Sequence, residues 1–96
     1  MKPSVAFEKN REFIRDVVAR RKTTNPRIFG SVLHGTDHEG SDVDILVDAL
    51  PGTTLFDLGD LQFELEEKLG VSVQVVTPAE LSRYFRDKVL AEAEPV

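Results

Sequence analysis

GSVLHGTDHEGSDVD, residues 30–44, is the stretch that decides the fold and carries most of the chemistry. It lies between two apolar segments, which indicates a connection between two buried strands. A Gly-Ser step opens it at Gly30 and Ser31, and an Asp-x-Asp closes it at Asp42 and Asp44, with ten residues between the two pairs. Binding a nucleoside triphosphate requires a group that holds phosphate and, facing it, carboxylates that hold a divalent metal. This stretch offers both.

The two aspartates predict a Mg²⁺ site. On a strand, residues two apart project from the same face, which puts the β-carbons of Asp42 and Asp44 roughly 6–7 Å apart. Two metal ions about 3.5–4 Å apart, as in phosphoryl-transfer sites, fit between such a pair. Mg²⁺ prefers one or two carboxylates together with substrate phosphates. Taken alone, an Asp-x-Asp is also common on an exposed strand edge or turn.

Gly30 and Ser31 predict the phosphate-binding half of the same site. A glycine at the end of a strand lets a ligand approach the backbone closely. Ser31 offers a hydroxyl and an N–H at the start of a helical turn, where anions bind readily. A plain break between strand and turn is the alternative for this pair alone. Combined with the carboxylates, the pair predicts binding of ATP or another nucleoside triphosphate.

Length and composition predict one globular domain over residues 1–96. The chain is 41% hydrophobic and 30% charged, with a net charge of −5 and no cysteine. The negative charge makes nucleic acid an unfavourable partner and suits a basic protein instead. No apolar run approaches the roughly 20 residues of a membrane span, and no secretory signal is present. We therefore expect a cytoplasmic protein that binds neither nucleic acid nor membrane.

The remaining pattern alternates helical and strand segments. We expect helices over residues 4–21 and 55–69, one or two short helices from 77 to about 93, and strands over 27–29, 43–47 and 71–76. Ser4 is the expected N-cap of the first helix, and residues 22–26 are expected to break it. Thr54 with Asp57 predicts a capping box, and Gly70 the end of that helix. The order predicts an α/β domain, a mixed sheet of three or four strands with helices packed on it.

The pattern Gly-Ser-x10-Asp-x-Asp between two apolar strands resembles the signature of the DNA polymerase β-like nucleotidyltransferase superfamily. The short chain and its tail, residues 76–93, are similar to the minimal nucleotidyltransferase (MNT) branch, which includes MntA-like antitoxins paired with HEPN-domain toxins. The resemblance implies a nucleotidyltransferase fold, with Ser31 gripping the triphosphate and Asp42 and Asp44 binding Mg²⁺. It also implies transfer of AMP from ATP to a hydroxyl group, in antitoxins a tyrosine of the toxin.

Two positions depart from the family pattern. The superfamily has a third carboxylate on a later strand, and Gln74 stands in that place, on the strand face opposite Val73 and Val75. Glutamine takes no proton at neutral pH, and loss of a general base typically slows a reaction ~10²–10⁴-fold. His34 stands where active minimal transferases often have arginine, and a neutral imidazole does not replace a fixed cation. His34 and His38 could also form a metal pair, although their loop does not enforce it.

Three functions follow from these residues. The first is an MNT-type antitoxin that neutralises a HEPN-type toxin by binding it and by Mg²⁺-dependent AMP transfer to a toxin tyrosine. The second is a degenerate transferase that acts only as a protein-binding module, which Gln74 and His34 favour. The third is a stand-alone transferase acting on a small molecule. Tyr84 and Phe85 are either core residues or part of a patch for the partner.

Overall fold

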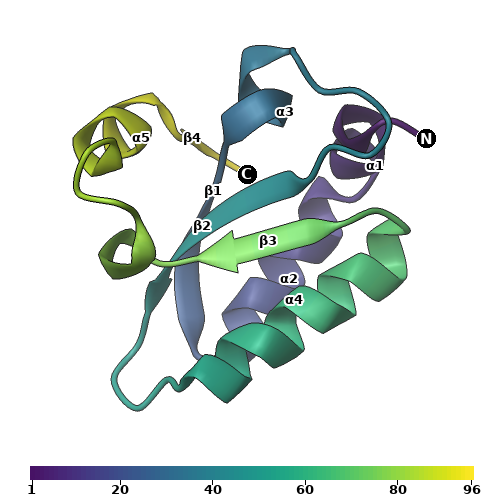
Figure 1. The fold of residues 1–96 in the computed structure, drawn as a ribbon. Coiled ribbons are helices and arrows are strands. Elements are labelled where there is room, and N and C mark those ends of the chain that lie inside the picture. The colour runs from purple at the N-terminus through teal and green to yellow at the C-terminus, as the bar shows by residue number, and fades with distance from the viewer.

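Four strands form one mixed sheet in the computed structural model, which describes residues 1–96 (Figure 1). The strands are β1 (Thr23–Phe29), β2 (Val43–Ala49), β3 (Val73–Val76) and β4 (Glu94–Pro95). Their order across the sheet is β3-β2-β1-β4. β2 runs antiparallel to β1 and parallel to β3, and β4 runs antiparallel to β1. The mixed α/β sheet predicted from the sequence is confirmed, with four strands.

The helices are α1 (Pro3–Lys9), α2 (Arg11–Arg20), α3 (Gly30–His34), α4 (Leu55–Leu69) and α5 (Arg86–Glu92), with a 3-10 turn η1 at Pro78–Glu80. α2 packs against β1, and α4 packs against both β3 and α2. Figure 1 shows α2 and α4 side by side on one face of the sheet. None of these helices is long and apolar enough to cross a lipid bilayer.

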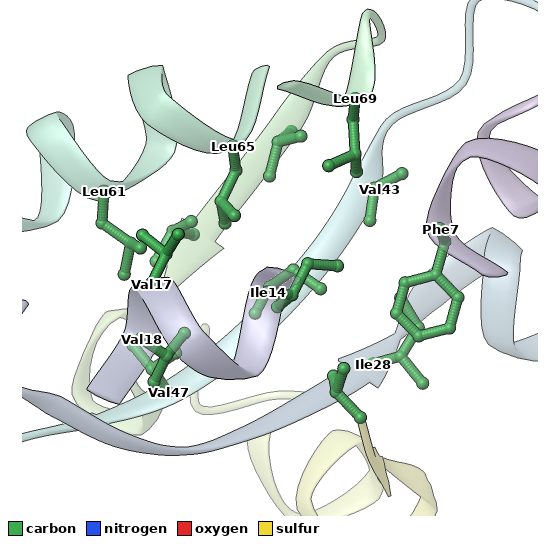
Figure 2. Close-up of a cluster of buried hydrophobic side chains, with 14 of the residues drawn as sticks. Phe7, Ile14, Val17, Val18, Ile28, Val43, Val47, Leu61, Leu65 and Leu69 are labelled. Carbon is green, nitrogen blue, oxygen red and sulfur yellow. The ribbon is translucent and has the colours of Figure 1, made fainter. Parts of the chain in front are cut away.

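The hydrophobic core lies between the sheet and the α2–α4 layer (Figure 2). Val43, Ile45 and Val47 project from β2 toward the helices, where they are fully buried. The helices contribute the apolar face of α2 and a stripe of buried leucines on α4: Leu58, Leu61, Leu65 and Leu69. Because side chains alternate along a strand, Asp44 must project from the opposite face of β2. Core packing therefore fixes which sheet face carries the carboxylate.

The N-terminal helix differs from its prediction in two ways. It is not continuous: Asn10 leaves the helical region (φ −125°, ψ 19°), and its Nδ2 donates to the Ala6 carbonyl at 2.8 Å. Asparagine competes for backbone groups in this way, which favours a break over a helix interior. Ser4 is not the N-cap but lies inside α1, where its N–H donates to Asp37 Oδ2 at 2.8 Å. The capping acceptor thus comes from a distant loop.

β2 starts at Val43 as predicted, whereas β1 and β3 start elsewhere. β1 begins at Thr23, inside the segment expected to break the chain, because the irregular residues are absorbed within the strand. Lys22 and Asn25 adopt positive φ, and the pairing with β2 shifts between Thr24 and Arg27 as in a β-bulge. β3 starts at Val73, two residues later than expected.

The α4 helix matches its prediction at both ends, and the short helices predicted after Thr77 are also present. Thr54 and Asp57 form the capping box, and Gly70 ends α4 with φ 72°. Thr77 and Glu80 form the predicted capping box at the start of η1, and α5 follows and ends at Glu92. β4 was not predicted, because two residues including a proline carry no readable strand period.

The β3 edge of the sheet is covered by side chains of α4. Gln62 Oε1 accepts the N–H of Val75 at 3.0 Å, and Glu66 Oε2 accepts the N–H of Val73 at 3.1 Å. These outward N–H groups would otherwise be free to pair with another strand. The edge is therefore closed to strand addition at these two positions.

Candidate functional site

The sheet places two of the predicted site residues, Asp44 and Gln74, in one cross-strand row. Asp44 on β2 is the register partner of Phe29 on β1 and of Gln74 on β3. Gly30 and Ser31 follow Phe29 directly and form the first turn of α3. Residues separated by up to 44 positions in the chain thus meet on the sheet face that α2 and α4 leave open.

Gly30 makes the closest approach to Asp44. Its φ is 75°, a left-handed conformation that glycine adopts without strain. A β-carbon at this position would overlap Asp44 Oδ2 and lie 3.1 Å from Asp44 Cγ. The backbone at residue 30 therefore forms a wall of the cradle around the carboxylate, and only glycine leaves that space open. Ser31 is half-buried in the same turn, where a helix leaves its first N–H groups without intrahelical partners.

The carboxylates of Asp42 and Asp44 repel each other. Asp42 is exposed immediately before β2, and Asp44 is half-buried within the strand. Burial of the Asp44 carboxyl raises its pKa to about 6, and the negative charge of Asp42 acts in the same direction. No lysine or arginine forms an ion pair with either carboxylate. The pair therefore concentrates negative charge that a bound cation would relieve.

The donor set fits Mg²⁺ as far as the protein supplies it. No group of three or more acidic, histidine or cysteine side chains gathers as a complete metal cage. Mg²⁺ commonly takes one or two carboxylates and completes its shell with water and substrate phosphates. Two hard carboxylate oxygens beside an open glycine backbone satisfy that requirement.

Gln74 lies beside Asp44 in the parallel pairing, and its side chain is exposed on the predicted face. Two nearby acids offer no substitute for a carboxylate here. Asp37 is buried, and the hydrogen bond from the Ser4 N–H lowers its pKa. Glu39 lies near the N-terminal amine, with Oε1 3.4 Å from the nitrogen. The β3 position beside Asp44 therefore holds an uncharged amide.

The two histidines hydrogen-bond to different partners. His34 Nε2 lies 2.9 Å from Glu92 Oε2 and so links α3 to α5. His38 Nδ1 lies 2.9 Å from the carbonyl oxygen of Glu39 in its own loop. Each of these hydrogen bonds engages one ring nitrogen of a different histidine, and neither links the two side chains.

One ion pair on the Asp44 face was missed from the sequence. Arg27 on β1 donates from Nη2 to Asp48 Oδ1 at 2.8 Å, and its side chain is only 14% exposed. The Arg27 Nε is buried without a partner. Strand alternation could have placed both residues on this face. Asp48 lies four residues after Asp44 on β2, and Arg27 lies two residues before Phe29 on β1. The pair connects β1 to β2 beyond the carboxylate row.

The fold and the carboxylate pair define a small domain of the nucleotidyl-transferring class. A family model described as "Nucleotidyltransferase domain" matches residues 10–95, and the chain belongs to this family as a minimal nucleotidyltransferase. The chain is 44% identical over 69 residues to a candidate protein adenylyltransferase of Methanocaldococcus jannaschii, covering 72% of this chain and 74% of that relative.

Solved structures agree with the family assignment. A candidate minimal nucleotidyltransferase superposes with a TM-score of 0.86 at 38% identity, over 97% of this chain and 95% of that one. One chain of a toxin–antitoxin complex with AMP-PNP gives a TM-score of 0.76 at 25% identity, over 90% and 71%. A chain of the complex between tri-AMPylated Shewanella oneidensis HEPN toxin and MNT antitoxin gives 0.69 at 20% identity, over 92% and 70%, and shows the fold alone.

Proposed function

We propose that this protein is an antitoxin-like nucleotidyltransferase that binds Mg²⁺–ATP and neutralises a HEPN-type toxin by binding it. We also propose a second activity, the transfer of AMP to a tyrosine of that toxin, at a lower rate than a site with a general base would give. The observation that carries the proposal is the cradle in which the Gly30 backbone meets the Asp44 carboxylate. The similarity to one chain of a toxin–antitoxin complex with AMP-PNP supports both the nucleotide and the partner.

Each site residue has a role in nucleotide binding. Asp42 and Asp44 would hold Mg²⁺, which when bound neutralises charge on the phosphates. Gly30 allows the phosphates to approach the backbone, and Ser31 donates its hydroxyl and N–H to phosphate oxygens. Asp44 must be ionised to bind a cation, and its pKa of about 6 allows this at neutral pH.

The transfer step requires the toxin's tyrosine oxygen to attack the α-phosphorus of ATP. A new P–O bond forms to the tyrosine, the bond to the β-phosphate breaks, and pyrophosphate leaves. The phenolic proton must go to solvent, because Gln74 can accept a hydrogen bond but not a proton. Loss of a general base typically costs ~10²–10⁴-fold in rate. We therefore expect slow transfer from an otherwise competent nucleotide site.

A protein-binding module without catalysis is the second candidate, and Gln74 is the observation that favours it. The test looks for a HEPN-domain protein encoded beside this gene and mixes it with the purified protein, Mg²⁺ and ATP. Size-exclusion chromatography should show a complex, and intact mass should show a slow AMP adduct that disappears in Asp44→Ala. A complex without any adduct would favour the binding module. Absence of a complex would refute the antitoxin proposal.

A further inference from the structure

The outward side of α4 carries large apolar side chains that the fold does not bury. Leu55, Phe56 and Phe63 are 75%, 86% and 63% exposed. Phe56 and Phe63 are seven residues apart, so they lie two turns apart on one side of the helix. The core leucines of α4, such as Leu61 and Leu65, point the other way into the sheet layer (Figure 2). We call Leu55, Phe56, Gly59 and Phe63 the outer face of α4.

Gly59 sits between the two phenylalanines without a reason inside the monomer. A β-carbon added there would meet no atom within 4 Å, and its φ is not in the left-handed region. Glycine lowers the stability of a helix interior relative to alanine. Because Gly59 has no side chain, a gap remains between Phe56 and Phe63, where another helix backbone could approach closely.

Negative charge is concentrated on the same helix. Residues 55–69 carry five acidic side chains and one lysine, a net charge of −4, compared with −5 for the whole chain. Glu64 is neutralised by Arg20 and Arg21, but Asp60 and Glu67 are exposed and form no ion pair. Helical spacing places Asp60 and Glu67 along one side of the phenylalanines. The outer face is therefore apolar with an acidic border.

The charge pattern selects among possible occupants. A second copy docking α4 against α4 would bring the unpaired acids Asp60 and Glu67 of both copies together, and an anionic membrane would be repelled in the same way. An added strand is also disfavoured, because Gln62 and Glu66 occupy outward N–H groups of β3. A basic helix satisfies both the apolar face and its border.

We propose that the outer face of α4 docks an amphipathic helix of a protein partner, with apolar side chains over Gly59 and lysine or arginine facing Asp60 and Glu67. This deepens the proposed function by naming the surface that holds the partner, and it rests on that function for the partner's identity. α4 packs on one face of the sheet (Figure 1), and strand alternation places Asp44 on the other face. Docking there leaves the nucleotide site open.

The test uses a fluorescent synthetic helical peptide with a leucine stripe bordered by lysines, and a matched peptide bordered by glutamates. Anisotropy should show that the wild-type protein binds the lysine peptide and not the glutamate peptide. The double variant Phe56→Ser, Phe63→Ser should bind at least about tenfold more weakly, as expected for central aromatic anchors. Gly59→Leu should also bind more weakly, although it should raise the unfolding midpoint.

Tyr84→Ser is the matched control, because Tyr84 is a similarly exposed aromatic residue outside α4. It should bind the lysine peptide as the wild type does. Equal loss in Tyr84→Ser, or unchanged binding in the double phenylalanine variant, would overturn the proposal. Concentration-dependent dimerisation that Phe63→Ser abolishes would overturn it in favour of a second copy.

ATP titrations separate this inference from the proposed function. The α4 variants should retain Mg²⁺-dependent ATP binding, and Asp44→Ala should lose ATP binding while still binding the peptide. If wild-type protein bound the peptide but no HEPN-domain protein, the docking surface would stand and the antitoxin function would fail. If HEPN binding survived the double phenylalanine variant, the antitoxin function would stand and this surface would fail.

Discussion

At Asp44, the requirements of stability and of the proposed cation binding conflict. Core packing of Val43 and Ile45 forces its carboxyl into a half-buried position beside Asp42, where ionisation is unfavourable. A protein selected for stability alone would place a neutral residue there. The cost is explained if Asp44 serves to bind a cation.

Asp44→Asn should stabilise the protein in a pH-dependent way. The pKa of Asp44 is raised by burial and by Asp42 from 3.8 to about 6. The folded protein holds this proton more tightly than the unfolded chain does. Protonation of Asp44 therefore contributes stability to the wild-type protein that is complete below about pH 4 and is lost as pH rises through about 6. At pH 8 the substitution should raise the free energy of unfolding by about 1 kcal/mol, reduced from the full shift by solvent screening.

Urea unfolding at pH 4 and pH 8 measures this effect, and little change is expected at pH 4. Asp48→Asn is the control, because it breaks the ion pair with Arg27 and should not stabilise the protein. An equal gain from Asp44→Asn at both pH values would contradict the electrostatic explanation.

Gly30→Ala should be destabilising and should abolish ATP binding. The new β-carbon would overlap Asp44 Oδ2 in a left-handed backbone conformation. Strain and displacement together should cost about 1–3 kcal/mol. Gly35→Ala is the matched control, since its φ of 71° imposes similar strain but no atom lies within 4 Å. Similar losses of ATP binding in both variants would show that contact with Asp44 is irrelevant.

Gln74→Asp should accelerate AMP transfer or tighten Mg²⁺ binding. The new carboxylate would stand beside Asp44 in the parallel register, able to accept a proton. Restoring a general base should raise the transfer rate ~10²-fold or more. Intact mass spectrometry of the HEPN partner over time measures the rate. No change in either rate or Mg²⁺ affinity would show that position 74 is not the third-acid position.

At the scale of elements, local signals were predictable from sequence and distant ones were not. The bounds and caps of α4 follow from its leucine period, Thr54, Asp57 and Gly70, all within the segment itself. The cap that Asp37 provides to α1 depends on contacts made only in the folded chain. β4 likewise forms only because β1 is there to pair with it. The site row was predictable in part, because strand alternation places Asp44 and Gln74, but their register partnership required the structure.

The double variant Gln62→Ala, Glu66→Ala should expose the β3 edge to pairing with a strand of another molecule. It removes both acceptors from the N–H groups of Val73 and Val75 while leaving the core face of α4 unchanged. Each unpaired N–H should cost about 1 kcal/mol and become available to another strand. Sedimentation velocity should therefore detect self-association. A protein that stayed monomeric with unchanged stability would contradict a protective role for these side chains.

At the scale of the whole molecule, the sheet separates two surfaces. One face presents Gly30, Asp44 and Gln74, and the α4 layer on the other presents apolar side chains bordered by acids. A small transferase whose substrate is itself a protein needs both a nucleotide site and a surface that holds the substrate. The sequence predicted the first from one motif. The second became visible only when α4 was seen to face the core with its leucines and solvent with its phenylalanines.

Isothermal titration of ATP into the protein at pH 8, with and without Mg²⁺, tests the central claim most directly. We predict Mg²⁺-dependent binding of one nucleotide that is abolished in Asp44→Ala and retained in Asp60→Ala, an acid on the opposite side of the molecule. ATP binding that is equally strong in Asp44→Ala would contradict the assignment of the Gly30–Asp44 cradle as the nucleotide site.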